Sequence, residues 1–479
     1  MLPDVPQAAL LDLYDPDRSA APLRDGRPVT WAEVDRALAR LVSLLDGTGG
    51  EGFRLLTGTV TSPTLARQIG AMQARWPGAR WHVFEPLAED GPRRAAALAF
   101  GRPLDRQPAL EAAEVVVALD DDLLGPGPHQ IVTARRWAER RRDLQAGAGD
   151  SRLMVAEPVP SLTGTRADAR LVTPARRIGR LAVTIAAELG VGEVPATGPA
   201  LTARERDWAM RAARALAAAG PRGLFTVGPR HPAEVQALAF LVNARTGALG
   251  QTLRFTEPVA ALPPAGSTSF DRPTSFDQLV DDMAAGRVTT LAVLGANPAY
   301  AAPAGSGFGE AAAQVGTIIH AGLHVDETAA IAGWHLPLAH ELESWSDARA
   351  VDGTVSIIQP LVRPFHDVRG RHRVLAGLTG ILPGGAEPPE RAWVMETWRQ
   401  RWGAAFEDRW RAALLAGLVE GTAAPEGRPD AVIDPPAVAD EPVVDGLSVV
   451  FGPDPTIWDG RFADNAWLQE TPKPANKVT

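Results

Sequence analysis

Short apolar runs alternate with longer amphipathic stretches along most of the chain. Runs such as Phe53–Val60 and Glu114–Asp120 have the length and apolar content of buried strands. The stretch Trp31–Leu45 instead carries its apolar residues at helical spacing, and Thr30 with Glu33 forms the sequence signature of a capping box. Strands that alternate with helices of ten or more residues predict βαβ units and parallel sheets. We expect two doubly wound sheets, because 479 residues exceed the size of a single core.

Beyond about Leu382 the pattern changes. The segment 389–421 is amphipathic and rich in tryptophan, and it predicts one long helix or two paired helices. Trp398 and Trp402 are four residues apart, so they share a helical face. We expect these tryptophans to pack onto the body of the protein or onto a partner subunit. The stretch Thr422–Pro442 is rich in Pro, Ala, Glu and Asp, and it predicts a flexible connection.

Charge and composition exclude several classes of protein. The formal net charge is −9, which argues against nucleic acid as a partner, because phosphate binding requires a basic face. The chain contains no cysteine, and this excludes disulfides, cysteine-ligated iron–sulfur clusters and thiol nucleophiles within it. The N-terminus lacks the basic and apolar regions of a signal peptide. No apolar run approaches the roughly 18 residues of a membrane span, so we expect a soluble chain.

Four of the nine histidines fall between His320 and His340, and they raise the question of a metal site. A zinc site requires His and carboxylate side chains that converge on one point. His335 and His340 are five residues apart, which does not place them on one helical face, and no HExxH motif is present. His320 and His324 are four apart, but they lie at a probable strand end. We interpret each as a packing or surface histidine.

Two glycine-rich turns follow apolar strands, at Leu294–Pro298 (LGANP) and at Asp120–His129 (DDDLLGPGPH). Exposed amides in such turns can hold phosphate. Neither turn matches GxGxxG or a Walker A loop, and the chain contains no GxSxG or SxxK motif. The residues alone therefore indicate a large α/β protein without a recognisable active-site motif.

The order of these segments resembles that of the molybdopterin oxidoreductases, the dimethyl sulfoxide reductase family. The resemblance covers most of residues 10–380. It rests on six stretches that occur in the family's order: LYDPDRSAAPLRDGRPVTWAEVDRAL, EVVVALDDDLLGPGP, RLMVAEPVPSLTGTRADARLVTPAR, FTVGPRHPAEVQALAFLVNARTGALGQTLRF, LAVLGANPAYAAP and WHLPLAHELESWSDARAVDGTVSIIQP.

Within that family the sequence is most similar to the B subunit of alternative complex III, a bacterial quinol:electron-acceptor oxidoreductase, through stretches such as DPTIWDGRFADNAWLQETPKP. The resemblance implies an N-terminal part that keeps the molybdopterin-enzyme fold without the molybdenum cofactor. It places the iron–sulfur clusters in a separate ferredoxin-like C-terminal part. That part is missing here, so we expect a fragment or one half of a split gene, with no cofactor in this chain.

The resemblance also implies how the domains are arranged. We expect an α/β, molybdopterin-oxidoreductase-like fold with two interleaved, doubly wound Rossmann-like domains, parallel sheets, and a C-terminal helical and loop extension. The first domain would comprise residues 1–95 and 275–380, and the second residues 96–270. Residues 381–421 would form the helical extension. Residues 422–479 would form a linker and a strand or loop that leads to the missing C-terminal domain.

Five positions match residues that lie near the pterin in active relatives. Gly295, Asn297 and Pro298 belong to the LGANP turn, Glu343 falls on a loop beside the cofactor channel, and Gln359 is what remains of a polar pattern. The resemblance implies that these positions are vestiges of a cofactor site. We expect no catalytic and no metal-ligating residue in this chain.

These expectations favour a structural, cofactor-free portion of a respiratory quinol:electron-acceptor oxidoreductase. Its partners would be other subunits of a membrane-associated complex, on the periplasmic side. Two alternatives remain open. One is a catalytic molybdopterin-dependent oxidoreductase fragment with Asp4 as metal ligand, since the stretch before Asp17 contains neither Cys nor Ser. The other is a metal-dependent hydrolase that uses His335, His340 and Glu343.

Overall fold

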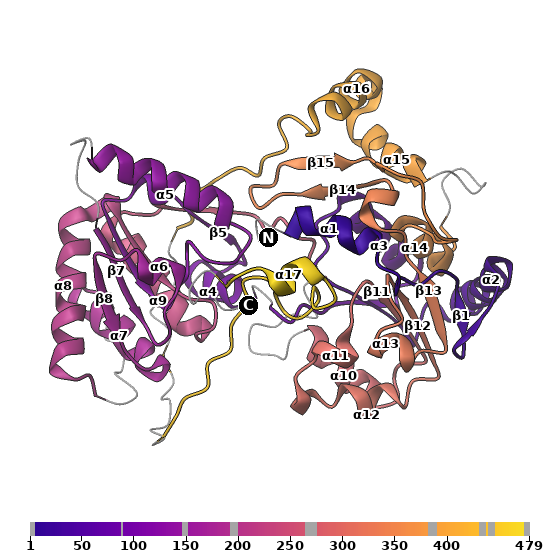
Figure 1. Cartoon of the computed structure of the whole chain (residues 1–479), viewed down its shortest axis with the longest axis horizontal. Coiled ribbons are helices and arrows are strands. Elements are labelled where there is room, and N and C mark those ends of the chain that lie inside the picture. Colours follow the sequence, from indigo (N-terminus) through magenta and orange to yellow (C-terminus); the bar gives the residue numbers. More distant parts are fainter. Residues whose placement is uncertain are drawn as a thin grey trace. The chain divides into compact units, whose positions relative to one another are not determined.

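The computed structural model contains two units, each built around its own parallel sheet (Figure 1). Unit 1 comprises residues 1–10, 87–258 and 424–479, and unit 2 comprises residues 11–86 and 259–423. Each unit is therefore assembled from separate stretches of the sequence. The structure describes residues 5–87, 90–145, 152–191, 200–263, 275–381, 390–430, 437–438 and 446–473.

Unit 2 contains a seven-stranded sheet in the order β2-β1-β13-β12-β11-β3-β4. The strands from β13 to β4 are parallel, whereas β1 pairs antiparallel with β13. A separate hairpin is formed by β14 and β15. The strands of unit 2 are β1 (Leu23–Arg24), β2 (Arg27–Pro28), β3 (Phe53–Thr57), β4 (Arg80–Val83), β11 (Thr290–Leu294), β12 (Thr317–Gly322), β13 (Trp334–Pro337), β14 (Ser346–Arg349) and β15 (Val355–Ile358).

Helices cover both faces of this sheet, and each face has its own apolar core. Helices α2, α3 and α14 bury one face, and α10 with α12 bury the other. The capping box of Thr30 and Glu33 is present, as predicted. The helices of unit 2 are α2 (Trp31–Thr48), α3 (Pro63–Arg75), α10 (Ser275–Ala284), α11 (Pro298–Ala301), α12 (Phe308–Ala312), α13 (Glu327–Ala330), α14 (Arg371–Thr379), α15 (Glu390–Trp402) and α16 (Phe406–Ala416).

Unit 1 contains a four-stranded parallel sheet in the order β8-β7-β6-β9, and β5 pairs with β10 in a separate antiparallel ribbon. Helices α4, α7, α8 and α9 contribute to its apolar core. Its strands are β5 (Asp105–Pro108), β6 (Val115–Leu119), β7 (Arg152–Glu157), β8 (Ala169–Val172), β9 (Gly223–Val227) and β10 (Leu253–Thr256). Its helices are α4 (Asp90–Phe100), α5 (Gln130–Gln145), α6 (Leu162–Thr165), α7 (Ile178–Glu188), α8 (Ala203–Ala219), α9 (Ala233–Thr246) and α17 (Ala466–Glu470), while α1 (Val5–Leu13) spans the boundary between the units.

The tryptophan-rich segment forms two helices, α15 and α16, that pack on the β14–β15 hairpin of unit 2. Trp398 is fully buried, and its ring lies 4.7 Å from that of Trp402, centroid to centroid. The predicted shared face is confirmed. These helices bury Trp393, Trp398 and Trp410. Residues up to 423 belong to unit 2, and residues 424–479 belong to unit 1.

For the C-terminal region the sequence left a strand or a loop open, and the described residues 446–465 form loop and turns. Leu447, Val449 and Phe451 alternate as a strand would, but their side chains are exposed and no neighbouring strand pairs with them. The described residues that follow form turns and the short helix α17. No helix among the described residues combines the length and the apolar character that a membrane crossing requires.

Candidate functional site

The candidate site lies where the strand order of unit 2 reverses. β3 and β11 are neighbours, but the chain continues from β3 to β4 on one side and from β11 to β12 on the other. In open α/β sheets, ligands bind outside the carboxyl ends of the strands at such a point. The loops that leave β3 and β11 here begin with Gly58 and Gly295. The predicted LGANP turn is therefore at the ligand-binding edge of its sheet.

The two glycines let the loops approach each other closely. A Cβ atom on Gly58 would lie 3.8 Å from the carbonyl oxygen of Gly295. Gly295 has φ +67°, which is strained for residues with a side chain. Its Cβ position would lie 3.8 Å from the guanidinium of Arg371, which also pairs with Glu341 at 3.5 Å. The carboxylate of Glu85 accepts a hydrogen bond from the Thr59 hydroxyl at 3.2 Å beside Gly58.

Asn297 and Pro298 connect this turn to helix α13. Pro298 is the first residue of α11, where its missing N–H costs no hydrogen bond. The Asn297 amide donates to Glu327 Oε2 at 2.7 Å. Its carbonyl oxygen accepts from the backbone N–H of Thr328 at 3.2 Å and from the Thr328 hydroxyl at 2.8 Å. Both ends of the Asn297 side chain are thus engaged by α13.

Glu343 forms a buried ion pair with Arg18. Arg18 donates to its two carboxylate oxygens at 2.6 and 3.2 Å, and the side chains are 1% and 0% exposed. The backbone N–H groups of Phe365 and His340 also donate to this carboxylate, at 3.0 and 2.9 Å. Burial raises the pKa of Glu343, but these hydrogen bonds outweigh it and the pKa lies below its usual value. Glu343 therefore joins three segments of unit 2 as an ionised carboxylate.

Gln359 differs from the other four predicted positions. It is exposed and follows β15. Its side-chain amide donates to the backbone carbonyl of Leu414 in α16 at 3.2 Å. Gln359 therefore contacts the tryptophan-rich helices. Asp4, the candidate metal ligand of the catalytic alternative, lies outside the described residues.

The histidines form a buried polar chain that the sequence did not predict. His320 on β12 and His335 on β13 are register partners, and their Nδ1 atoms are 3.0 Å apart. His335 Nε2 lies 2.8 Å from the Ser19 hydroxyl, and His320 Nε2 lies 3.5 Å from Asp326. Burial lowers the pKa of both His320 and His335 to about 4, so both rings are neutral at pH 7.

The residues of the hydrolase alternative are held by different partners. His340 begins the short 3-10 helix η5 (Glu341–Glu343), where its Nδ1 accepts from the Leu342 N–H at 3.1 Å. His335 contacts His320 and Ser19, whereas Glu343 contacts Arg18. In the part of the chain that the structure describes, no three His, Asp or Glu side chains are grouped closely enough to hold a metal ion.

The corresponding edge of unit 1 is acidic. The strand order reverses between β6 and β9, and β6 is followed by Asp120, Asp121 and Asp122. Asp120 Oδ2 accepts from His231 Nε2 at 2.9 Å and pairs with Arg230 at 3.2 Å. Asp121 pairs with an arginine, and Asp122 accepts from a threonine. Carboxylates therefore gather at the turn where the sequence suggested a phosphate site, and like charge opposes phosphate binding there.

Comparisons with known proteins support the fold. The sequence matches no protein-family model and no curated protein. Among solved structures, the chain is similar to acetylene hydratase from Pelobacter acetylenicus, with a TM-score of 0.60 and 13% sequence identity. The similarity covers 82% of this chain and 65% of acetylene hydratase, so the chain spans less than two thirds of that enzyme. Acetylene hydratase has the molybdopterin-oxidoreductase fold, and the predicted fold class is confirmed.

Proposed function

We propose that this chain is a structural, cofactor-free portion of a respiratory quinol:electron-acceptor oxidoreductase, similar to the B subunit of alternative complex III. Electrons would pass through iron–sulfur clusters outside this chain. The chain would supply a folded scaffold that contacts other subunits of a membrane-associated complex, on the periplasmic side.

Two kinds of observation support this proposal. The characteristic segments of the family follow one another in the same order along residues 10–380. The structure has the molybdopterin-oxidoreductase fold, which is the fold expected of such a scaffold. The fold alone does not distinguish a scaffold from a catalytic relative, so the side chains at the candidate site carry the argument.

The observation that carries the proposal is the engagement of Glu343 and Asn297 by their own neighbours. If the Glu343 side chain turned from Arg18 to a cofactor, Arg18 would be buried without a counterion, which would destabilise the fold. A dinucleotide cofactor also brings phosphates, which require free cations or amides. The nearby Arg371 already faces Glu341, and Glu85 adds another carboxylate beside Gly58. These residues are a poor fit to an anionic pterin dinucleotide.

The cofactor content of the full chain tests this proposal. The chain would be purified from cells that make molybdopterin, together with a molybdopterin enzyme expressed in the same cells as a positive control. Molybdenum and iron would be measured by mass spectrometry, and oxidised pterin by its fluorescence after denaturation. We expect signals far below one equivalent per chain. Stoichiometric molybdenum or pterin would overturn the proposal and favour the catalytic alternative.

Membership in a complex requires a separate test. A tag would be placed on the chain at its chromosomal locus, and membranes would be solubilised in mild detergent. We expect the tagged chain to co-purify with quinol oxidation activity and with the electron paramagnetic resonance signals of iron–sulfur clusters. Recovery of the whole tagged population as free protein in the soluble fraction, without these signals, would contradict the proposed role.

A further inference from the structure

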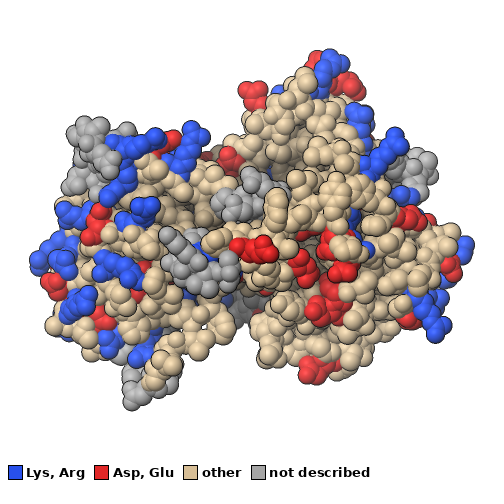
Figure 2. Space-filling view, viewed as in Figure 1, with Lys and Arg blue, Asp and Glu red and all other residues tan. Residues whose placement is uncertain are grey.

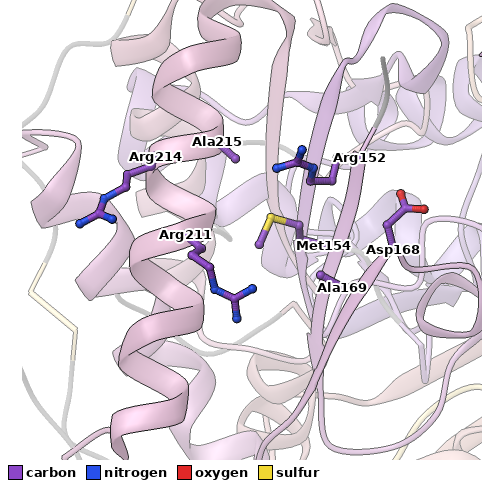
Figure 3. Close-up of a pocket in the computed structure, with 7 residues that line it drawn as sticks. All are labelled: Arg152, Met154, Asp168, Ala169, Arg211, Arg214 and Ala215. Atoms are coloured by element: carbon purple, nitrogen blue, oxygen red, sulfur yellow. The ribbon is translucent and has the colours of Figure 1, made fainter. Parts of the chain in front are cut away.

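A cavity in unit 1 is lined by arginines and lies away from the ligand-binding edge of that unit's sheet. It has a volume of about 470 Å³ and lies beside helix α8 and the first residues of β7 and β8 (Figure 3). This position is at the amino ends of the strands, opposite the carboxyl edge described above. The residues that line it are Arg152, Met154, Asp168, Ala169, Arg211, Arg214 and Ala215.

The pleat of the sheet directs three of these residues toward α8. Arg152 and Met154 are two positions apart on β7, so they share one face. Ala169 on β8 is the register partner of Met154 and lies on the same face. Met154 is buried and forms an apolar floor, while the small side chain of Ala169, with that of Ala215 across the cavity, leaves the space open.

Two guanidinium groups face this space from opposite sides. Figure 3 shows Arg152 extending from the strand toward the helix and Arg211 extending from the helix toward the strands. Within the described residues Arg152 has no hydrogen-bonding or ion-pair partner on its side chain. Arg211 donates only its Nε to Asp207, at 3.0 Å, in an exposed pair of the kind that contributes little stability. Both groups therefore keep donors for a ligand.

Asp168 is the one acidic residue among the described residues that line the cavity, and it does not neutralise these charges. Asp168 accepts two hydrogen bonds from Arg141 of α5, at 3.0 and 3.1 Å, and one from the backbone N–H of Leu153 at 2.8 Å. Figure 3 shows its carboxylate on the far side of the strand from Arg211. The cavity therefore has a positive excess, although the whole chain has a net charge of −9.

The segment of unit 1 that forms the cavity is itself basic. Residues 87–258, which make up most of unit 1, contain 23 arginines against 19 aspartates and glutamates. Figure 2 shows arginine side chains spread over the visible face of this unit. Arginine presents several donors in a fixed planar arrangement that matches carboxylate and phosphate oxygens. A cavity of this size accommodates such an oxyanion together with its water molecules.

We propose that this cavity binds an oxyanion with at least two negative charges, either a phosphoryl group or a pair of carboxylates, through Arg152 and Arg211. The charged groups would contact the two guanidiniums, and any apolar linker between carboxylates would lie on Met154. This site is separate from the candidate cofactor edge, and its test does not depend on the proposed function.

Isothermal titration calorimetry on the full chain tests the site with two probes, inorganic phosphate and succinate. We expect Arg152→Gln and Arg211→Gln each to weaken binding at least tenfold. Arg206→Gln is the matched control, because Arg206 lies on the same helix and is exposed but does not line the cavity. It removes the same charge and should weaken binding less than threefold.

A further variant tests whether binding depends on the shape of the cavity or only on its positive charge. Ala215→Met keeps every charge but fills the space, and methionine preserves helix propensity. We expect it to abolish binding, with an unchanged circular dichroism spectrum. Binding of phosphate alone would identify a phosphoryl site, and binding of succinate alone a dicarboxylate site. No binding of either probe, or equal losses in Arg152→Gln and Arg206→Gln, would overturn the proposal.

Discussion

The ion pair between Glu343 and Arg18 gives the sharpest test of the structure. Glu343→Gln keeps the shape of the side chain but removes its charge, so Arg18 would remain buried without a counterion. Breaking a buried pair from one side costs about 3–5 kcal/mol. The backbone N–H groups of Phe365 and His340 would also lose a charged acceptor. We expect the free energy of unfolding of unit 2 to fall by at least about 3 kcal/mol.

Urea denaturation with hydrogen–deuterium exchange would measure this change, because exchange reports unit 2 separately from unit 1. Glu341→Gln is the matched control, since Glu341 is 67% exposed and lies two residues away. It should cost under about 0.5 kcal/mol. The double variant Arg18→Met with Glu343→Leu should cost less than Glu343→Gln, because it leaves no charge buried alone.

The pH dependence gives an independent readout of the same pair. Because the folded-state pKa of Glu343 lies below its usual value, the carboxylate stabilises the fold at neutral pH. This contribution is lost as the pH falls through the folded-state pKa, and Glu343→Gln should lack that part of the acid dependence. If Glu343→Gln destabilises unit 2 no more than Glu341→Gln does, the pair is not structural, and the main support for a cofactor-free scaffold is removed.

Three further predictions concern unit 2. Gly322→Ala should lower the free energy of unfolding by about 1–3 kcal/mol, since the new Cβ would lie 2.5 Å from the His320 ring. Changed NMR chemical shifts of the His320 ring would locate the damage, and unchanged stability would contradict the packing. The pKa values of His320 and His335 are about 4 in the folded protein and about 6.5 in the unfolded chain. The free energy of unfolding should therefore keep its full value above pH 6.5 and fall toward pH 4, by up to about 3 kcal/mol per histidine. Urea midpoints between pH 7 and 4 measure this loss, and a flat profile would refute it. Trp398→Phe removes the 2.9 Å hydrogen bond from its indole N–H to Asp347 and should cost about 1.5–3 kcal/mol by thermal denaturation; a cost near zero would show that the bond contributes nothing.

The sequence predicted helices and strands well where each is determined by residues that are close together in the chain. The capping box of Thr30 and Glu33 lies within one helical turn, and the adjacent residues Ser62 and Pro63 begin α3 in the same local way. The buried strands were visible as apolar runs. The alternating residues Leu447–Phe451 form no strand in the described structure, because alternation describes one strand, whereas a strand also needs a neighbour to bond with.

Long-range pairings could not be read from the sequence. Arg18 and Glu343 are separated by 325 positions, and nothing near either residue indicates the other. The contact of His320 with His335 depends on the register between β12 and β13, which follows from the whole sheet and not from either strand. The position of the LGANP turn after an apolar strand indicated a sheet edge, yet the contacts of Asn297 with α13 required the structure.

The run GWHLPLAHELESWSD shows why a dense group of polar residues is a weak indication of a metal site. A site formed by one short run requires its side chains to point toward one place. His335 lies within β13 and faces His320, whereas the chain leaves the strand after Pro337 and His340 begins a turn of helix. Glu343 then turns toward Arg18, and Asp347 on β14 accepts the indole N–H of Trp398. Each change of backbone direction sends the next side chain to a different part of unit 2, so these residues fix the positions of several segments and do not converge on one ligand.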